Sequence, residues 1–101
     1  MYLLHGKLTA KKGRANQLAN ILLEASSLVA TAKGCKLYAI SKDGSDPNTV
    51  FVTEIWVTKN DHVNSLGLPG VKDLIMKAMP LLEGQPQKGQ ELELIGGAGI
   101  E

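Results

Sequence analysis

The chain has 101 residues, 44% of them hydrophobic, which suits one domain with a single hydrophobic core. Its 11 basic and 10 acidic residues give a net charge of +1, so the composition gives no reason to expect a nucleic-acid or membrane-surface partner. Cys35 is the only cysteine and His5 and His62 are the only histidines, which excludes an internal disulfide and a three-histidine metal centre within one chain.

The N-terminal third is predicted to contain a strand followed by a helix. Residues Tyr2 to Ala10 have the composition of a strand and lead into a Lys-Lys-Gly turn. From Arg14 to Ala32 the apolar residues recur every three or four positions, which predicts an amphipathic helix of about five turns. Gly34 follows and is well placed to end this helix.

Two further strands are predicted to form a hairpin. Lys36 to Lys42 and Thr49 to Val57 are rich in β-branched and aromatic residues, and the polar segment 43–48 joins them. The second of these strands is apolar on both faces, because Trp56 shares one face with Glu54 while Phe51 and Ile55 occupy the other. Helices on one side of a sheet cannot cover both faces, so we expect a second copy of the chain to cover the other in a two-fold homodimer.

The C-terminal half is predicted to contain two short helices and a last strand. A capping pattern at Thr58 predicts a helix over residues 59–66, and a second helical stretch runs from residue 71 to about 79. Residues 91–95 alternate between polar and apolar and predict an edge strand. The glycine-rich segment 96–101 is predicted to be a flexible tail.

The order of these elements predicts the fold. Strand, helix, strand, strand, helix, strand is the βαββαβ pattern of an α+β ferredoxin-like sandwich, formed here by one domain over residues 1–101. Right-handed crossovers place both helical segments on the same face of the sheet. If the face of the third strand that carries Glu54 and Trp56 looks toward the helices, this pair lines a cavity between sheet and helices.

Several short motifs follow one another along most of the chain. They are Gly13 after the first strand, Gly34-Cys35-Lys36-Leu37-Tyr38 after the first helix, Asp46-Pro47-Asn48 in the hairpin and Glu54-Ile55-Trp56 in the third strand. In this order and spacing they resemble the antibiotic biosynthesis monooxygenase family. The resemblance implies a dimeric α+β barrel. It also implies one of several activities: cofactor-independent oxidation of quinols or anthrone-like polyketides, haem degradation, or isomerisation of a signalling sugar phosphate.

The chain departs from the family at two histidine positions. Many members carry a histidine nine residues after the tryptophan and another directly after a nearby proline, where this sequence has Ser65 and Gly70. Haem-degrading relatives use a histidine of this region as the iron ligand, and the residues here are Ser65 and Leu66. His62, one helical turn away, is the only nearby substitute, so we expect no haem binding.

Five residues are candidates for the site. Trp56 would stack on a planar substrate, and Glu54 beside it would act as a polar anchor or a catalytic base. Tyr38 would hydrogen-bond a phenolic substrate, and Asn64 would present its amide to a substrate carbonyl. His5, on a strand next to the third, is a second candidate base because an imidazole titrates near neutral pH.

Each candidate also has a plain structural interpretation. Trp56 would then be ordinary core, Glu54 would pair with a lysine, and His5 would be a satisfied structural histidine. For His62 and Asn64, on the predicted short helix, a solvated polar face is the default expectation.

The resemblance implies a homodimeric monooxygenase that oxidises a planar, electron-rich aromatic, such as a quinol or an anthrone, with O2. An ionised substrate of this kind can itself pass an electron to O2, so we expect no flavin, no metal and no other cofactor. Two alternatives stay open: a non-catalytic small-molecule-binding or stress-response module, and an isomerase, which would need a cationic residue facing the pocket. Because no apolar run approaches the roughly 20 residues of a membrane span and no charged leader opens the sequence, we expect a cytoplasmic protein.

Overall fold

The computed structural model describes residues 1–85 and 87–100. Along the chain its elements are β1 (Tyr2–Thr9), α1 (Ala15–Val29), β2 (Cys35–Lys42), β3 (Thr49–Trp56), α2 (Lys59–Ser65), α3 (Val71–Ala78), the 3-10 turn η1 (Met79–Leu81) and β4 (Gln90–Glu93). The predicted α+β ferredoxin-like order is therefore confirmed, with element ends that differ from the predicted ones by a few residues. The predicted tail includes residue 101, which lies outside the described residues.

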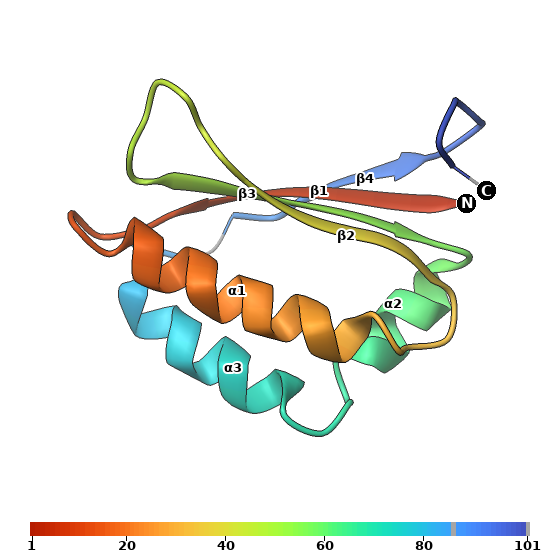
Figure 1. Ribbon diagram of the computed structural model, residues 1–101, viewed down its shortest axis with the longest axis horizontal. Helices are drawn as coiled ribbons and strands as arrows, with labels where there is room; N and C mark the ends of the chain where they lie inside the picture. The colour runs from red at the N-terminus through yellow and green to blue at the C-terminus, as the bar shows by residue number, and fades with distance from the viewer. Residues whose placement is uncertain (86, 101) are drawn as a thin grey trace.

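The four strands form one antiparallel sheet in the order β2-β3-β1-β4. Figure 1 shows α1 and α3 side by side across one face of this sheet, with α2 near the end of β3. The prediction that the last strand lies at an edge is confirmed, since β4 pairs only with β1 among the described strands. No helix in the described ranges has the length and apolar character needed to cross a membrane.

Two glycines fix how the helices connect to the rest of the fold. Gly34, between α1 and β2, has φ +82° and passes so close to Asp61 of α2 that a Cβ atom there would overlap the Asp61 carboxylate group. Gly70 precedes α3 with φ +88°, a backbone conformation that L side chains rarely adopt. The start of α2 is fixed by a side chain instead, because the backbone N–H of Asp61 donates to Thr58 Oγ1 at 3.1 Å.

Strand β3 turns one face toward the helices and the other away from them. Val50 and Trp56, on the helix side, are fully buried, Val50 among residues of α1 and α3 and Trp56 against Val29 and Val71. On the outer side Phe51 and Thr53 are only partly buried. Ile55, also on the outer side, is buried at 6% exposure, so the outer side is buried near the end of the strand and only partly buried in its middle.

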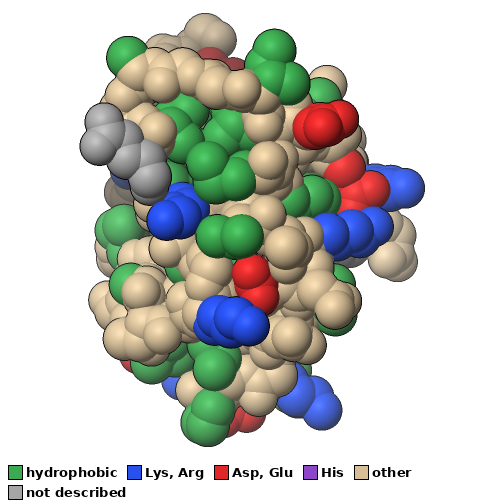
Figure 2. Space-filling view, turned by 90° about the vertical axis from the view of Figure 1, so that its right-hand side faces the viewer, with side chains coloured by type: hydrophobic (Ala, Val, Ile, Leu, Met, Phe, Trp, Pro, Cys, Tyr) green, Lys and Arg blue, Asp and Glu red, His purple; other side chains and the backbone are tan. Residues whose placement is uncertain are grey.

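The outer face of the sheet keeps an apolar surface. Leu37 and Leu92 are exposed there, and Leu37 and Ile55 line a shallow hollow together with Gly99 and Ile100 of the C-terminal segment. Figure 2 shows the end of the molecule that carries the chain termini, where apolar side chains line a hollow among scattered charges. Cover of this face by a second copy of the chain stays a prediction.

Candidate functional site

A cavity of about 240 Å³ lies between the sheet and the helices. It is lined almost entirely by apolar side chains of α1, α3, β1 and the segments around them, and its polar lining residues are Tyr38, Glu54, His62 and Ser65. Its volume is just below the roughly 300–1,000 Å³ that is usual for small-molecule sites. The cavity therefore suits a compact, mostly apolar ligand with one polar end.

Three apolar side chains mark the entrance to this cavity. Leu66, at the end of α2, and Ile75 and Met79, on and just after α3, line the cavity and are also exposed to solvent. The cavity is therefore bordered by apolar surface where these three side chains reach solvent.

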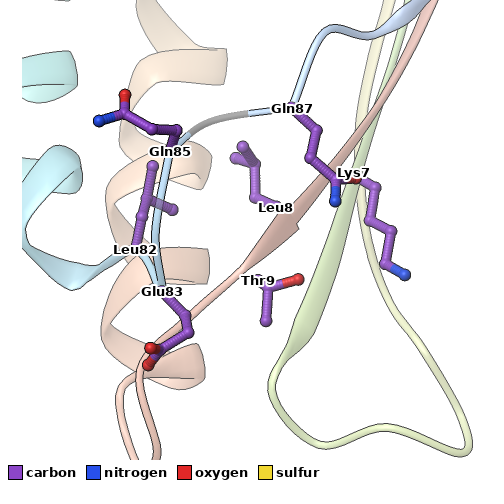
Figure 3. Close-up of a pocket in the computed structure, with 7 residues that line it drawn as sticks. All are labelled: Lys7, Leu8, Thr9, Leu82, Glu83, Gln85 and Gln87. Atoms are coloured by element: carbon purple, nitrogen blue, oxygen red, sulfur yellow. The ribbon is translucent and has the colours of Figure 1, made fainter.

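A second hollow lies on β1 and the segment that follows η1 (Figure 3). Lys7, Thr9, Glu83, Gln85 and Gln87 surround about 30 Å³ there. This volume holds about one water molecule, which is too little for an organic substrate.

Glu54 provides the buried charge of the cavity. Only 8% of the residue is exposed, and its Oε1 accepts a hydrogen bond of 3.0 Å from Nε1–H of Trp56. Burial raises the pKa of the Glu54 carboxyl, and the hydrogen bond from Trp56 opposes this effect. The expected lysine partner is absent from the ion pairs of the described residues: the basic group nearest to Glu54 Oε1 is Nδ1 of His62, at 3.9 Å.

His62 lies in the cavity wall, and the expectation of a solvated helix face is wrong for this residue. Its side chain is 14% exposed, and its ring stacks on Tyr2 with centroids 5.8 Å apart and planes inclined by 23°. The Trp56 ring lies at the same centroid distance with a tilt of 49°. Nδ1 of His62 is buried and has no hydrogen-bond partner among the residues that the structure describes.

Charged groups around His62 act on it in opposite directions. Burial lowers the pKa of the His62 imidazole, Glu91 raises it and Lys59 lowers it. Lys59 Nζ lies 2.9 Å from Glu91 Oε1, and the Tyr2 hydroxyl donates to that same oxygen at 2.9 Å. Burial and the bond to Glu91 raise the pKa of Tyr2 to about 12. The Tyr2 ring, which stacks on His62, is thereby held in place by the hydrogen bond from its neutral hydroxyl to Glu91 of β4.

Tyr38, on β2, is the third polar side chain at this end of the cavity. It pairs with Glu54 across the β2–β3 ladder and lines the cavity on the helix side of the sheet. Burial, together with the negative charge of Glu54, raises the pKa of the Tyr38 hydroxyl. Tyr38 therefore stays neutral near pH 7 and is able to donate a hydrogen bond to a ligand.

The other three predicted site residues lie outside the cavity wall. Trp56 is fully buried in the core, in line with its structural interpretation, and it acts on the site through its hydrogen bond to Glu54. Asn64 is exposed on α2. His5 lies on the opposite face of the sheet, where Nδ1 is 3.0 Å from Thr53 Oγ1 and the ring stacks on Phe51 at 5.3 Å.

Ser65 and Gly70, which stand where the sequence resemblance led us to look for histidine, have different surroundings. Ser65 lies three residues after His62 on the same face of α2 and lines the cavity, and its hydroxyl donates to the backbone carbonyl of His62 at 2.6 Å. Gly70 has the positive φ described above, which a histidine would adopt only with strain. Within the described ranges, no cluster of three or more acidic, histidine or cysteine side chains is arranged to hold a metal ion.

Comparisons with known proteins agree on one family. The family model described as antibiotic biosynthesis monooxygenase matches residues 1–76. A solved structure of a candidate antibiotic biosynthesis monooxygenase from Chloroflexus aurantiacus is 35% identical, with 99% of this chain and 98% of that chain covered and a TM-score of 0.88. A similar protein from Deinococcus radiodurans is 28% identical, with 100% and 99% covered and a TM-score of 0.82.

A more distant structure shares the fold. SnoaB, a cofactor-independent oxygenase from Streptomyces nogalater, is 10% identical, with 97% of this chain and 96% of that chain covered and a TM-score of 0.81. None of the curated proteins matches this chain.

Proposed function

The chain belongs to the antibiotic biosynthesis monooxygenase family, and from this membership we propose that it oxidises a small, planar, electron-rich aromatic with O2. The substrate class is that of quinols and anthrones. The active unit is a homodimer, and the substrate itself supplies the electrons, so that no flavin, metal or other cofactor takes part. The observation that carries this proposal is the apolar cavity with Glu54, His62 and Tyr38 gathered at one end.

The apolar walls favour an aromatic body, and Glu54 is the candidate base. Leu22 of α1, Leu74 of α3 and Leu8 of β1 provide hydrocarbon surface on different sides of the cavity. A carboxylate in such surroundings is a stronger base than one in water, as the raised pKa of Glu54 indicates. The base and the apolar surface are therefore adjacent, as proton removal from an aromatic substrate requires.

The proposed reaction converts a CH2 group between two aromatic rings into a ketone. Glu54 removes one proton, from the CH2 group or from the hydroxyl of its enol tautomer, which gives the same anion. This anion, shared between the carbon and a phenolate oxygen, passes an electron to O2 and then combines with the reduced oxygen to give a peroxide. Loss of the second proton breaks the O–O bond and forms the carbonyl. One oxygen atom ends in the ketone and the other leaves as water, so R2CH2 and O2 give R2CO and H2O.

The lining of the cavity weighs against the isomerase alternative. A phosphate-bearing substrate needs a cation, and neither lysine nor arginine is among the residues that line the cavity in the described part of the chain. The protein's contribution is instead to exclude water from the substrate and to place its acidic proton against Glu54.

Oxygen uptake with anthrone tests the proposal. Protein freed of flavin and dialysed against a chelator should consume O2 and form the ketone faster than the uncatalysed autoxidation, and the ketone should not form under anaerobic conditions. Glu54→Gln, which keeps the shape and loses the base, should lower the rate by about 10²-fold or more. Tight binding of anthrone without turnover would favour the binding-module alternative, and a requirement for added flavin would refute the proposed chemistry.

A further inference from the structure

We propose that His62 is a second catalytic residue, which binds the hydroxyl of a neutral phenolic or enolic substrate between its Nδ1 and Oε1 of Glu54. The substrate oxygen donates its proton to Glu54 and accepts a hydrogen bond from His62. This inference rests on the proposed function and extends it, because it identifies the chemical group that the cavity recognises.

The distance between the two side chains fits one oxygen atom. Glu54 Oε1 and His62 Nδ1 are 3.9 Å apart, which is too far for a direct hydrogen bond, and both residues line the cavity. An oxygen at about 2.8 Å from each atom would lie about 2 Å to the side of the line that joins them. A single hydroxyl at this point therefore satisfies both side chains.

The imidazole has an unmet hydrogen bond at this position. Nδ1 of His62 is buried without a partner in the part of the chain that the structure describes, and buried polar atoms are rarely left so. Tyr2 and Trp56 pack against the ring and hold it in place. Trp56 also fixes Oε1 of Glu54 through its N–H. Both atoms that would contact the substrate oxygen are thus positioned before the substrate arrives.

The charges in and around the cavity favour a neutral substrate. When the hydroxyl proton moves to Glu54, the O–H bond breaks and the negative charge passes from the carboxylate to the substrate oxygen, so the net charge of the cavity is unchanged. His62, neutral because burial lowers its pKa, donates Nδ1–H to the new anion. A substrate that carries its own carboxylate or phosphate would place a second negative charge beside Glu54 in an apolar cavity.

The other titratable groups near His62 support this arrangement. Tyr2 of β1 stays neutral, and Glu91 of β4 is paired with Lys59 of α2, so these neighbours leave Glu54 as the acceptor that faces the gap.

Binding of naphthol tests the inference independently of oxygen chemistry. Naphthol carries one ionisable hydroxyl, naphthalene carries none, and naphthoic acid is an anion. We expect the protein to bind naphthol at least tenfold more tightly than naphthalene, and to bind naphthoic acid more weakly than naphthol. His62→Phe keeps a flat ring against Tyr2 and Trp56. It should lower the affinity of the protein for naphthol to its affinity for naphthalene.

Two further variants make the test specific. His62→Asn places an amide near the position of Nδ1 and should recover most of the preference for naphthol. Val63→Phe introduces the same ring at an exposed position of α2 and should leave the preference unchanged. Thermal unfolding of each variant shows whether the fold is intact, and His62→Asn provides the comparison if His62→Phe does not fold.

The results separate this inference from the proposed function. If anthrone is oxidised but His62→Phe keeps the preference for naphthol, the role of His62 is refuted and the oxygenase proposal stands. If the binding pattern is as expected but O2 is not consumed, the oxygenase proposal is refuted and the hydroxyl-binding site stands without a catalytic role for His62. Equal affinities for naphthol and naphthalene in the unmodified protein would overturn the inference directly.

Discussion

Replacement of Trp56 by phenylalanine tests how the buried carboxylate is stabilised. The indole is fully buried, and its N–H donates to Glu54 Oε1 at 3.0 Å. Loss of a hydrogen bond to a charged group costs about 1.5–3 kcal/mol. The smaller ring buries roughly 40 Å² less surface, which costs about 1 kcal/mol more at about 25 cal/mol per Å². We therefore expect Trp56→Phe to lower the free energy of unfolding by about 2.5–4 kcal/mol at alkaline pH, where the ionised form of Glu54 is most favoured.

The pH dependence of this loss distinguishes the hydrogen bond from simple packing. Without the donor, the pKa of Glu54 should rise further, because the Trp56 N–H favours the ionised form. As the pH falls toward about 5, Glu54 takes up a proton more readily in Trp56→Phe than in the unmodified protein, and the loss should shrink toward the packing contribution. Urea unfolding at both pH values measures this loss of unfolding free energy. Trp56→Phe made in the Glu54→Gln protein, which has no carboxylate at this position, is the control. An equal loss at both pH values would show that the hydrogen bond does not support the charge.

Three further predictions concern Glu54, the outer sheet face and haem. Burial raises the pKa of Glu54 in the folded state, so the stability gained from its protonated carboxyl is complete below the ordinary pKa and is lost as the pH rises through the raised value. Glu54→Gln should therefore have a higher free energy of unfolding than the unmodified protein near pH 8 and lose this advantage in acid, as measured by urea unfolding. Sedimentation should give a mass of at least two copies of the 10.8 kDa chain, and a charge at Phe51 or Ile55 should dissociate or unfold it; a monomer at micromolar concentration would contradict the homodimer. Haem titration should give no sharp stoichiometric Soret shift, and a tight complex that His62→Ala abolishes would show that our interpretation of the missing histidines is wrong.

The fold and one face of the site were predictable because strands impose a period of two. In β3 the alternation places Glu54 and Trp56 on one face regardless of register, and the structure shows that face turned toward the helices. The predicted hairpin placed Tyr38 on the strand next to Glu54, and the structure shows that the two residues pair directly. The depth of Trp56 was not predictable, because it depends on how Val29 and Val71, far apart in the sequence, pack against it.

The role of His62 could not be derived from the sequence for a physical reason. Helix α2 has only seven residues, and its apolar and polar residues show no clear face, so its rotation is set by tertiary packing on Tyr2 and Trp56. Ser65, three residues later, is buried, and its place in the cavity wall is known only from the structure.

The position of His5 depended on strand register. His5 pairs with Thr53, and residues that pair across an antiparallel ladder share a face, so His5 points away from Glu54. A shift of one residue would have turned it toward the cavity, and the sequence alone does not fix that register.

The destination of the oxygen atoms tests the central claim most directly. Protein free of flavin and metal is incubated with anthrone under isotopically labelled O2, and the ketone product is analysed by mass spectrometry. We predict that one labelled oxygen atom enters each newly formed carbonyl, and that formation of this product depends on Glu54, so that Glu54→Gln falls toward the uncatalysed rate. Product without the label, or labelled product formed equally fast by Glu54→Gln, would contradict oxygenation in this cavity.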